Sequence, residues 1–496
     1  DRVSGDDMSE FRAGISYPVP VAIKAEIPAV ENVISMEYMG GPSNMDIIST
    51  DGATVEKFME VNGFVLIQPE FFNVFDFKGT DFKWLSGTPI KSLSEPFSAV
   101  LTKTIAKKYF GESDPLGQTL RFHKKFDFKV TGVVEDFPSN SDFPFQVLLS
   151  YSSLNKMAGQ ERLNNWYAVN DTHCTYVVLS RGSKKEQVES EIAKVHAAHT
   201  SPELHKYRHY LLQKFSDVHY DARFRTFSGR TISRETLMGL GIVAVFLLLA
   251  GSINYINLST AQSALRAKEI GLRKVMGSNR RNLMMQFITE TFVVVVIAGM
   301  IALGLSEVLL YNLQSLLNIN HDRHVFTDPD ILLCLLCIIM SVTFFAGVYP
   351  SIIISRFNPL TALKYKFSNE TLGGISLRKI LVVLQFTITQ ILVVSTFIVV
   401  SQMRYFENVD MGFNREAIIT SKVSNIDVGK LQILQEQLRL QSFISNVSLG
   451  FTSPSGLTRN RTYPNIGRPD AKTLEDFTAF EYEAIDPNYL ELYQIK

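Results

Sequence analysis

The sequence predicts an α-helical transmembrane protein that also carries α+β domains outside the membrane. Four apolar runs reach or approach the length of about 20 residues that a helix needs to cross the hydrocarbon core. The first 230 residues instead mix helical and strand patterns, as a domain folded in water does. A hydrophobic content of 46% agrees with a chain that combines these two kinds of domain.

Charge and cysteine content exclude several other classes. The chain has 496 residues with 49 Lys and Arg against 49 Asp and Glu, so net charge indicates neither nucleic acid nor an acidic substrate. Two of its three cysteines, Cys334 and Cys337, lie inside an apolar run, so no disulfide framework, redox centre or metal site is indicated. The chain begins at Asp1 without a signal peptide, and we expect segments to be missing from both ends.

The first external domain is expected over residues 1–230. Its segment FSAVLTKTIAKKYFG has apolar residues at helical spacing before a glycine stop. The following TLRFHKKFDFKVTGVVEDF alternates apolar and polar residues, as strands with one buried face do. We therefore expect an amphipathic sheet with helices. The positions that carry the helical prediction are Val100, Leu101, Ile105, Tyr109 and Gly111.

The membrane helices are expected at residues 237–258, 287–311, 331–354 and 380–401. Short cytoplasmic loops keep Lys and Arg, whereas short external loops do not. Loops 264–281 and 355–379 are basic and loop 312–330 is acidic, so the first and third loops should be cytoplasmic. This places residues 1–230 outside, and the chain after residue 401 outside again. Within the second helix, Glu290 and Glu307 lie near the ends, where carboxylates can reach the interface or a neighbouring helix.

Residues 266–281, here called the elbow, separate the first two membrane helices. The elbow and its flanks hold six Lys and Arg against Glu269 alone. A cytoplasmic location explains this positive charge, but it does not explain the spacing of the apolar residues. Leu272, Val275 and Met276 fall on one side of a short helix, Gly277 suits a left-handed cap, and Ser278 or Asn279 can begin the next helix. Such a short amphipathic element is expected to dock in a groove of a cytoplasmic partner.

An internal repeat links the two external parts of the chain. IQPEFFNVFDFK (67–78) and IDPNYLELYQIK (485–496) align without a gap, and VENVIS and FISNVS precede them at comparable distances. We therefore expect a second copy of the external domain to start within residues 404–496. The matched pairs are Ile67 and Ile485, Pro69 and Pro487, Phe71 and Tyr489, Phe75 and Tyr493, and Lys78 and Lys496.

Catalytic signals are weak. His196, His199, His205 and His209 have spacings that could bind zinc on a helix, but Pro202 interrupts the face, and solvated surface is the preferred interpretation. The chain contains no P-loop, G-x-S-x-G or H-E-x-x-H motif. We expect no catalytic, cofactor-binding or metal-binding residues, so any nucleotide-driven activity needs a separate ATPase.

The motifs KEIGLRKVMGSNRRNLMMQFITET, AVLTKTIAKKYFGESDPLGQTLRF, FKVTGVVEDFPSNSDFPF and FNPLTALKY resemble the permease subunits of MacB/FtsX-type (type VII) ABC transporters. The resemblance covers nearly the whole chain. It implies a MacB-like periplasmic core domain over 1–230, an FtsX-like transmembrane domain over 231–365, a cytoplasmic linker and helix over 366–403, and a second core domain from 404 to 496.

The resemblance also implies a function. A separate P-loop ATPase would push the elbow, and the helix near 230–265 would transmit the movement to the periplasm, for export or extraction of peptides, lipoproteins or hydrophobic drugs. The alternative is an FtsX-like regulator that controls a periplasmic hydrolase or senses a ligand without transport. A zinc-dependent external enzyme is a weaker third hypothesis. Carried onto this sequence, the ATPase-coupling residues are Glu269, Ile270, Gly271, Leu272, Arg273, Lys274, Met276 and Gly277.

Location and partners follow from the same resemblance. It implies a multi-pass protein of the bacterial inner membrane with large periplasmic domains. The expected partners are the ATPase, the lipid bilayer, a second permease copy or half in a homodimer or pseudo-symmetric dimer, and a periplasmic adaptor, with no nucleic acid. Close helix packing is expected at the small residues Gly239, Gly241, Ala250, Gly251 and Ser252.

Overall fold

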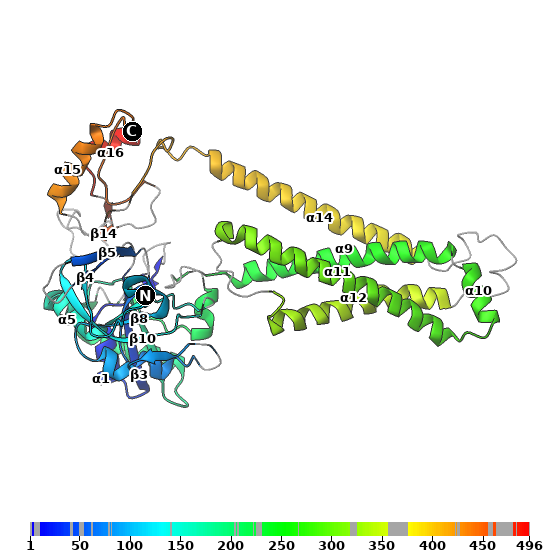
Figure 1. The fold of residues 1–496 in the computed structure, drawn as a ribbon, viewed down its shortest axis with the longest axis horizontal. Coiled ribbons are helices and arrows are strands. Elements are labelled where there is room, and N and C mark those ends of the chain that lie inside the picture. The colour runs from blue at the N-terminus through cyan, green and yellow to red at the C-terminus, as the bar shows by residue number, and fades with distance from the viewer. Residues whose placement is uncertain are drawn as a thin grey trace. The chain divides into compact units, whose positions relative to one another are not determined.

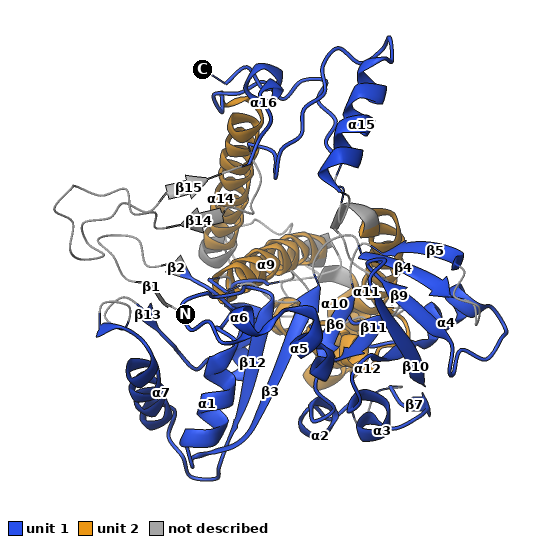
Figure 2. Cartoon of the chain, turned by 90° about the vertical axis from the view of Figure 1, so that its left-hand side faces the viewer, with its two compact units in different colours: residues 1–233, 410–496 blue, residues 234–409 orange. Residues whose placement is uncertain are grey.

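A computed structural model of the chain divides it into two compact units, residues 1–233 with 410–496, and residues 234–409 (Figure 2). The structure describes residues 2–3, 10–39, 43–48, 54–60, 63–77, 80, 82–138, 141–202, 205, 208–221, 223–224, 231–265, 267–317, 325–355, 375–421, 423, 427–454, 460–462, 480–482 and 484–495.

Residues 1–233 form an α+β domain around a mixed sheet, as the sequence predicts (Figure 1). The sheet order is β12-β3-β6-β11-β8-β10-β9-β4-β5, with β7 paired to β10. The β10–β8 and β11–β6 pairs are parallel and the others antiparallel. Its strands are β3 (Val30–Met39), β4 (Ser43–Ile48), β5 (Thr54–Glu60), β6 (Phe64–Ile67), β7 (Trp84–Ser86), β8 (Ser98–Thr102), β9 (Thr119–Phe122), β10 (Phe126–Val134), β11 (Val147–Ser150) and β12 (His173–Leu179). A small separate sheet joins β13 (Arg208–His209), β1 (Arg2–Val3) and β2 (Glu10–Phe11).

Helices cover this sheet and connect its strands. They are α1 (Pro18–Glu26), α2 (Phe71–Val74), α3 (Pro89–Leu93), α4 (Lys103–Phe110), α5 (Leu154–Met157), α6 (Gln160–Leu163) and α7 (Lys185–His199), with 3-10 turns η1 (Tyr151–Ser153) and η2 (Phe215–Tyr220). Helices α1 and α7 pack together against β3 and β12 through buried Val19, Ile23, Val33, Val188 and Ile192.

The centre of the sheet is buried on both faces. In β6, Phe64 and Leu66 point into one hydrophobic cluster and Val65 and Ile67 into another. A strand buried in this way needs a continuous apolar run, and FVLI is one. The core therefore lies on both sides of β6, β8 and β11.

One sequence prediction is wrong in this region. Val100 and Leu101 were assigned to a helix, but they lie in the central strand β8, and α4 begins only at Lys103. Both side chains are fully buried and face opposite clusters, so sheet burial overrides the local helical spacing. The helical positions of Ile105 and Tyr109 and the stop at Gly111 are confirmed, with Gly111 at φ 60°.

The strand prediction that follows α4 is confirmed. Strands β9 and β10 form an antiparallel pair in which Leu120, Phe122, Phe128 and Val130 are buried. The alternation of the sequence therefore marks one buried face.

Residues 410–496 contain α15 (Val428–Arg439), β14 (Asn460–Thr462), β15 (Phe480–Tyr482) and α16 (Asn488–Leu492). Strands β14 and β15 pair in antiparallel fashion. Asp427 caps α15 by accepting a hydrogen bond from the Gly429 amide at 2.8 Å. Tyr489 and Tyr493 are buried on one side of α16.

Residues 234–409 form a bundle of long helices (Figure 1). Among the described residues, four helices are long and apolar enough to cross a membrane, as predicted. Helix α11 packs on α12, and α9 contacts both α12 and α14. The helices are α9 (Arg234–Leu265), α10 (Ala267–Val275), α11 (Arg280–Leu317), α12 (Pro329–Ser355) and α14 (Ile375–Asn408), and the short α10 lies at one end of the bundle.

Candidate functional site

The elbow is a short helix with a glycine stop. Helix α10 ends in two backbone hydrogen bonds, from the Ser278 amide to the Arg273 carbonyl at 2.9 Å and from the Gly277 amide to the Lys274 carbonyl at 3.1 Å. This is the pattern of a Schellman cap, and Gly277 has φ +99°. Helix α11 starts at Arg280, so the expected cap and restart are both present.

Apolar residues fix the inner side of the elbow. Ile270 and Leu283 are almost fully buried, and Gly271 is buried between them in sequence. Burying a side chain of this size stabilises by roughly 1.5–3 kcal/mol. A helix too short to be stable alone is therefore held by the bundle.

The cations of α10 are engaged within the chain. Arg273 donates to Glu269 Oε1 at 2.6 Å and to Gln286 Oε1 on α11 at 2.8 Å. Lys274 Nζ donates to the carbonyl of Ser355, the last residue of α12, at 2.7 Å. These contacts place positive charge at a helix C-terminus, where the helix dipole favours it. Both cations, which the resemblance counts among the ATPase-coupling residues, thus make contacts inside the bundle.

Arg280 completes this clamp on α12. Its Nε donates to Ser355 Oγ at 3.0 Å. Partial burial, and then the charge of Arg280, lower the pKa of Lys274 below its ordinary value. The elbow is therefore tied to α11 through Arg273 and to α12 through Lys274 and Arg280.

Apolar side chains remain on the outside of the elbow. Leu272, Val275 and Met276 have exposed fractions of 52%, 64% and 71%. They stand three and four residues apart, so they occupy neighbouring positions on one helix face. The elbow therefore presents an apolar surface on a support that polar contacts fix in place.

The interpretation of the four histidines as solvated surface is wrong for His196, which is 1% exposed because its ring packs edge-on against Tyr210. His196 Nδ1 lies 3.5 Å from His205 Nδ1, whereas His199 stacks on Trp166 and approaches Glu26 Oε1 at 3.2 Å. Within the part of the chain that the structure describes, no three His, Cys, Asp or Glu side chains are placed to hold a metal ion. The zinc hypothesis gains no support.

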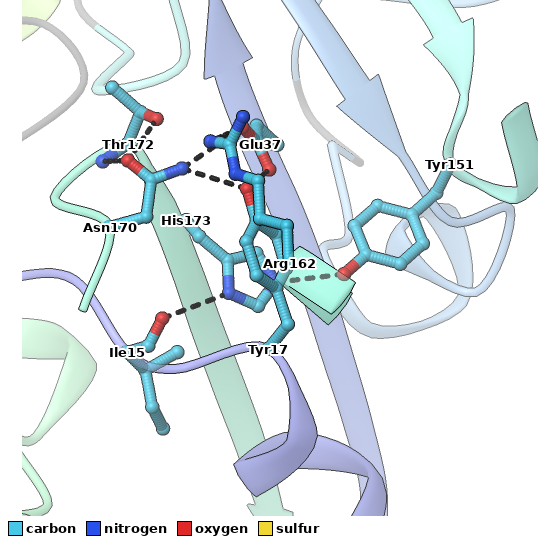
Figure 3. A network of polar contacts seen from close by, with 8 residues as sticks. All are labelled: Ile15, Tyr17, Glu37, Tyr151, Arg162, Asn170, Thr172 and His173. Carbon is cyan, nitrogen blue, oxygen red and sulfur yellow. Dashed lines mark hydrogen bonds and ion pairs between the residues drawn. The ribbon is translucent and has the colours of Figure 1, made fainter. Parts of the chain in front are cut away.

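A buried polar network that the sequence did not reveal lies where β3, β12 and the segment before α1 meet (Figure 3). Glu37 is 4% exposed and accepts hydrogen bonds from Tyr17 Oη at 2.6 Å and Asn170 Nδ2 at 3.0 Å. Arg162 approaches the same carboxylate at 3.6 Å and lies over the Tyr17 ring. Burial raises the pKa of Glu37, and the Tyr17, Arg162 and Asn170 contacts oppose that shift.

His173 forms the other half of this network. Its Nδ1 lies 3.2 Å from the Ile15 carbonyl and its Nε2 lies 2.8 Å from Tyr151 Oη. A carbonyl can only accept, so Nδ1 carries the proton and Nε2 accepts from the Tyr151 hydroxyl. Burial lowers the pKa of His173 to about 4, so the imidazole is neutral near pH 7. The bonded partners are 20 to 158 residues apart in sequence, so no local spacing could have predicted them.

The fold and the elbow together define a membrane protein in which a helical bundle is joined to an α+β domain. A family model for the MacB-like periplasmic core domain matches residues 2–195, and one for the FtsX-like permease C-terminal region matches residues 241–359. The chain therefore belongs to the MacB/FtsX-type permeases of ABC transporters.

Curated relatives agree with this family. The chain is 27% identical over 280 residues to the macrolide export ATP-binding/permease protein MacB of Bdellovibrio bacteriovorus, covering 54% of this chain and 39% of that protein. It is 24% identical over 356 residues to the pyoverdine export ATP-binding/permease protein PvdT of Pseudomonas syringae, covering 69% and 47%. The chain thus spans less than half the length of these relatives.

Among solved structures, the periplasmic region of MacB from Actinobacillus actinomycetemcomitans aligns with a TM-score of 0.28 at 17% identity. The alignment covers 42% of this chain and 83% of that one.

Proposed function

We propose that the chain is the permease and mechanotransmission subunit of an ABC transporter in a bacterial inner membrane. A separate P-loop ATPase docks on the elbow, and α9 carries the movement to the periplasmic domain. The observation that carries this proposal is the exposed apolar face of Leu272, Val275 and Met276 on a clamped helix. Apolar anchors on rigid supports are typical of interface hot spots.

The clamp also gives the movement a route. A push on α10 reaches α12 through Lys274 and α11 through Arg273. It reaches α9 through the covalent junction near Leu265, and α9 is one continuous helix of 32 residues. A continuous helix suits the transmission of axial force because its hydrogen bonds resist compression.

The docking proposal is tested with Leu272→Asp combined with Met276→Asp. Neither side chain has a buried role here, so insertion should be preserved, while the loss of two apolar anchors should abolish co-purification with the ATPase that accompanies the native chain. Leu116→Asp, at an exposed site of the periplasmic domain, is the matched control. Unchanged ATPase recovery by the double variant would remove the elbow as the docking site.

Arg273→Glu is a different perturbation. It would lose Gln286 and face Glu269 with a like charge, so it should loosen the elbow itself. Its effect therefore reports on the support rather than on the docking face.

We further propose that residues 410–496 begin a second periplasmic domain built like the first. The two segments have the same hydrogen bonds at aligned positions. The Val33 amide donates to Asn32 Oδ1 at 2.9 Å, and the Val447 amide donates to Asn446 Oδ1 at 2.8 Å.

The second shared bond joins, within each segment, two residues that are distant in sequence. The Ser35 amide donates to Gln68 Oε1 at 2.9 Å, and the Leu449 amide donates to Asp486 Oδ2 at 3.0 Å. The next backbone pair also corresponds, Met36 with Ile67 and Gly450 with Ile485. Three equivalent contacts at aligned positions support a shared fold more strongly than the short sequence match does alone.

The second candidate function is an FtsX-like regulator. The same elbow and α9 would serve it, because a regulator needs the transmitted movement but no path for cargo. Vesicles with the permease and its ATPase separate the two. ATP-dependent movement of a solute or release of membrane-bound cargo supports the transporter, whereas an ATP effect only on a periplasmic hydrolase supports the regulator. The cargo class proposed is peptides, lipoproteins or hydrophobic drugs.

The remaining partners are proposals on the same basis. Added Cβ atoms at Gly239, Gly241 and Gly251 of α9 would meet nothing within 4 Å, so α9 is open to another helix at these small residues. That arrangement supports packing against a second permease copy or half, and a periplasmic adaptor is proposed for export.

A further inference from the structure

The turn η2 is fixed to the periplasmic domain. The Phe215 ring lies 5.3 Å from that of Phe75 and 6.2 Å from that of Phe143. His219 Nδ1 lies 3.0 Å from Asp142 Oδ1. These contacts hold one side of η2 against the aromatic cluster of the sheet, so the other side is presented in a defined orientation.

Residues 211–220, which lead into and form η2, expose large apolar groups and a cation. Leu211, Phe215 and Tyr220 have exposed fractions of 46%, 54% and 38%. Lys214, directly before η2, is also exposed. Aromatic side chains and Lys with its long stem are the groups enriched at the interface between water and lipid.

A backbone bond holds η2 close to the point where the chain enters the bilayer. The Ile232 amide donates to the His219 carbonyl at 3.1 Å. Helix α9 begins two residues later at Arg234, and its uninterrupted apolar run begins at Leu237. From Ile232 to the apolar run, two extended residues and one helical turn span only about 12 Å. Part of that distance lies within the headgroup layer.

The charge of this region also differs from that of the chain. Residues 205–234 contain seven Lys and Arg against two Asp, in a chain whose net charge is zero. A loop as long as the periplasmic domain crosses the membrane largely regardless of its charge, so topology does not account for these cations. Arg208 and Arg223 already bond within the domain, to the Trp166 carbonyl and to Asp221, whereas anionic phospholipid headgroups are the partner that complements exposed Lys214 beside a membrane helix.

We propose that η2 and its flanking residues Leu211 and Lys214 rest on the anionic headgroups of the leaflet from which α9 starts. Phe215 and Tyr220 lie at the headgroup boundary, and Lys214 pairs with lipid phosphate. The bilayer thereby supports the base of the domain directly, so movement of α9 tilts the domain against a lipid surface.

The test uses the full chain in lipid nanodiscs. Tyr220→Trp adds an indole at the contact, over the constant background of Trp84 and Trp166, and lipids brominated near the headgroup should quench the added emission. Val55→Trp, on the exposed edge strand β5, is the matched control and should not be quenched. Should Tyr220→Trp disturb folding, Leu211→Trp is the second probe of the proposed contact.

The headgroup component is measured separately. Lys214→Gln should lower the affinity of η2 for the headgroups about fivefold in discs that contain phosphatidylglycerol. In pure phosphatidylcholine the same substitution should leave that affinity unchanged. Lys184→Gln, at the start of α7, is its control. An unquenched Trp at both sites, or equal quenching at residue 55, would overturn the lipid contact. Equal effects of Lys214→Gln in both lipids would overturn the role of anionic headgroups.

Discussion

The neutral His173 should make the periplasmic domain sensitive to mild acid. Its pKa falls from 6.5 to about 4 on folding because the ring is buried. The folded domain therefore binds this proton less tightly than the unfolded chain, so the stability is complete above pH 6.5 and is lost as the pH falls towards 4. At pH 5.0 the loss from this residue amounts to about 2 kcal/mol relative to pH 7.5.

The measurement is urea unfolding of the detergent-solubilised chain at both pH values, followed by tryptophan fluorescence. The chain has only two tryptophans, Trp84 and Trp166, and both lie in residues 1–233, so the signal reports this domain. His173→Gln should lower stability at pH 7.5, because it loses the bond to Ile15, yet reduce the loss between the two pH values by about 2 kcal/mol.

Two neighbouring groups set the remaining pH dependence. Burial and the cations around it also lower the pKa of His196 to about 4, so His196 adds a loss of the same sign. Glu37 acts in the opposite direction, because its raised pKa stabilises the fold below pH 4.5 and that stabilisation is lost as the pH rises. Exposed His209, replaced by Gln, serves as the control. Equal pH losses in the parent and His173→Gln proteins would refute the assignment.

Three further substitutions test the packing and the elbow. Gly14→Ala places a Cβ against the Asn170 carbonyl oxygen, so the backbone must shift, and the same assay should show a loss of about 2–3 kcal/mol. The added Cβ of Gly277→Ala meets no atom within 4 Å, but the alanine must adopt a left-handed backbone conformation. The substitution should therefore lower the free energy of unfolding by about 1 kcal/mol and reduce protection of the α10 amides in hydrogen exchange. Tyr17→Phe removes a hydrogen bond to buried Glu37 and should cost about 1.5–3 kcal/mol in urea unfolding, and a loss under 0.5 kcal/mol would argue against the network.

The sequence predicted those features that depend on local pattern. The membrane helices follow from apolar length, and the elbow stop follows from the one residue, Gly277, that accepts its conformation without strain. Val100 and Leu101 show the limit of that approach. A short apolar run can belong either to a helix or to a strand buried on both faces, and its pattern alone does not distinguish them. The choice between the two is made by neighbouring strands that are distant in sequence.

The candidate site shows a second limit. The apolar face of the elbow could be predicted from spacing, but the partners of its cations could not. Lys274 reaches Ser355, 81 residues away, and Arg273 reaches across the turn to Gln286. Charge in a sequence records that a side chain is ionised and not which group it meets, so the contacts that Lys274 and Arg273 make within the bundle could not be predicted.

A comparison of residues 1–233 with the proposed repeat in residues 410–496 bears on which contacts the proposed fold requires. If Asn32 and Asn446 correspond, then Tyr17 and Glu37 of the first segment align with Leu431 and Phe451 of the second. The bonds of Asn32 with Val33 and of Asn446 with Val447 occur in both segments, whereas Phe451 is 55% exposed and does not correspond to a buried carboxylate. A buried backbone amide must be paired in any copy of a fold, but a buried carboxylate need not be kept, so the proposed repeat requires the amide bonds and not the Glu37 network.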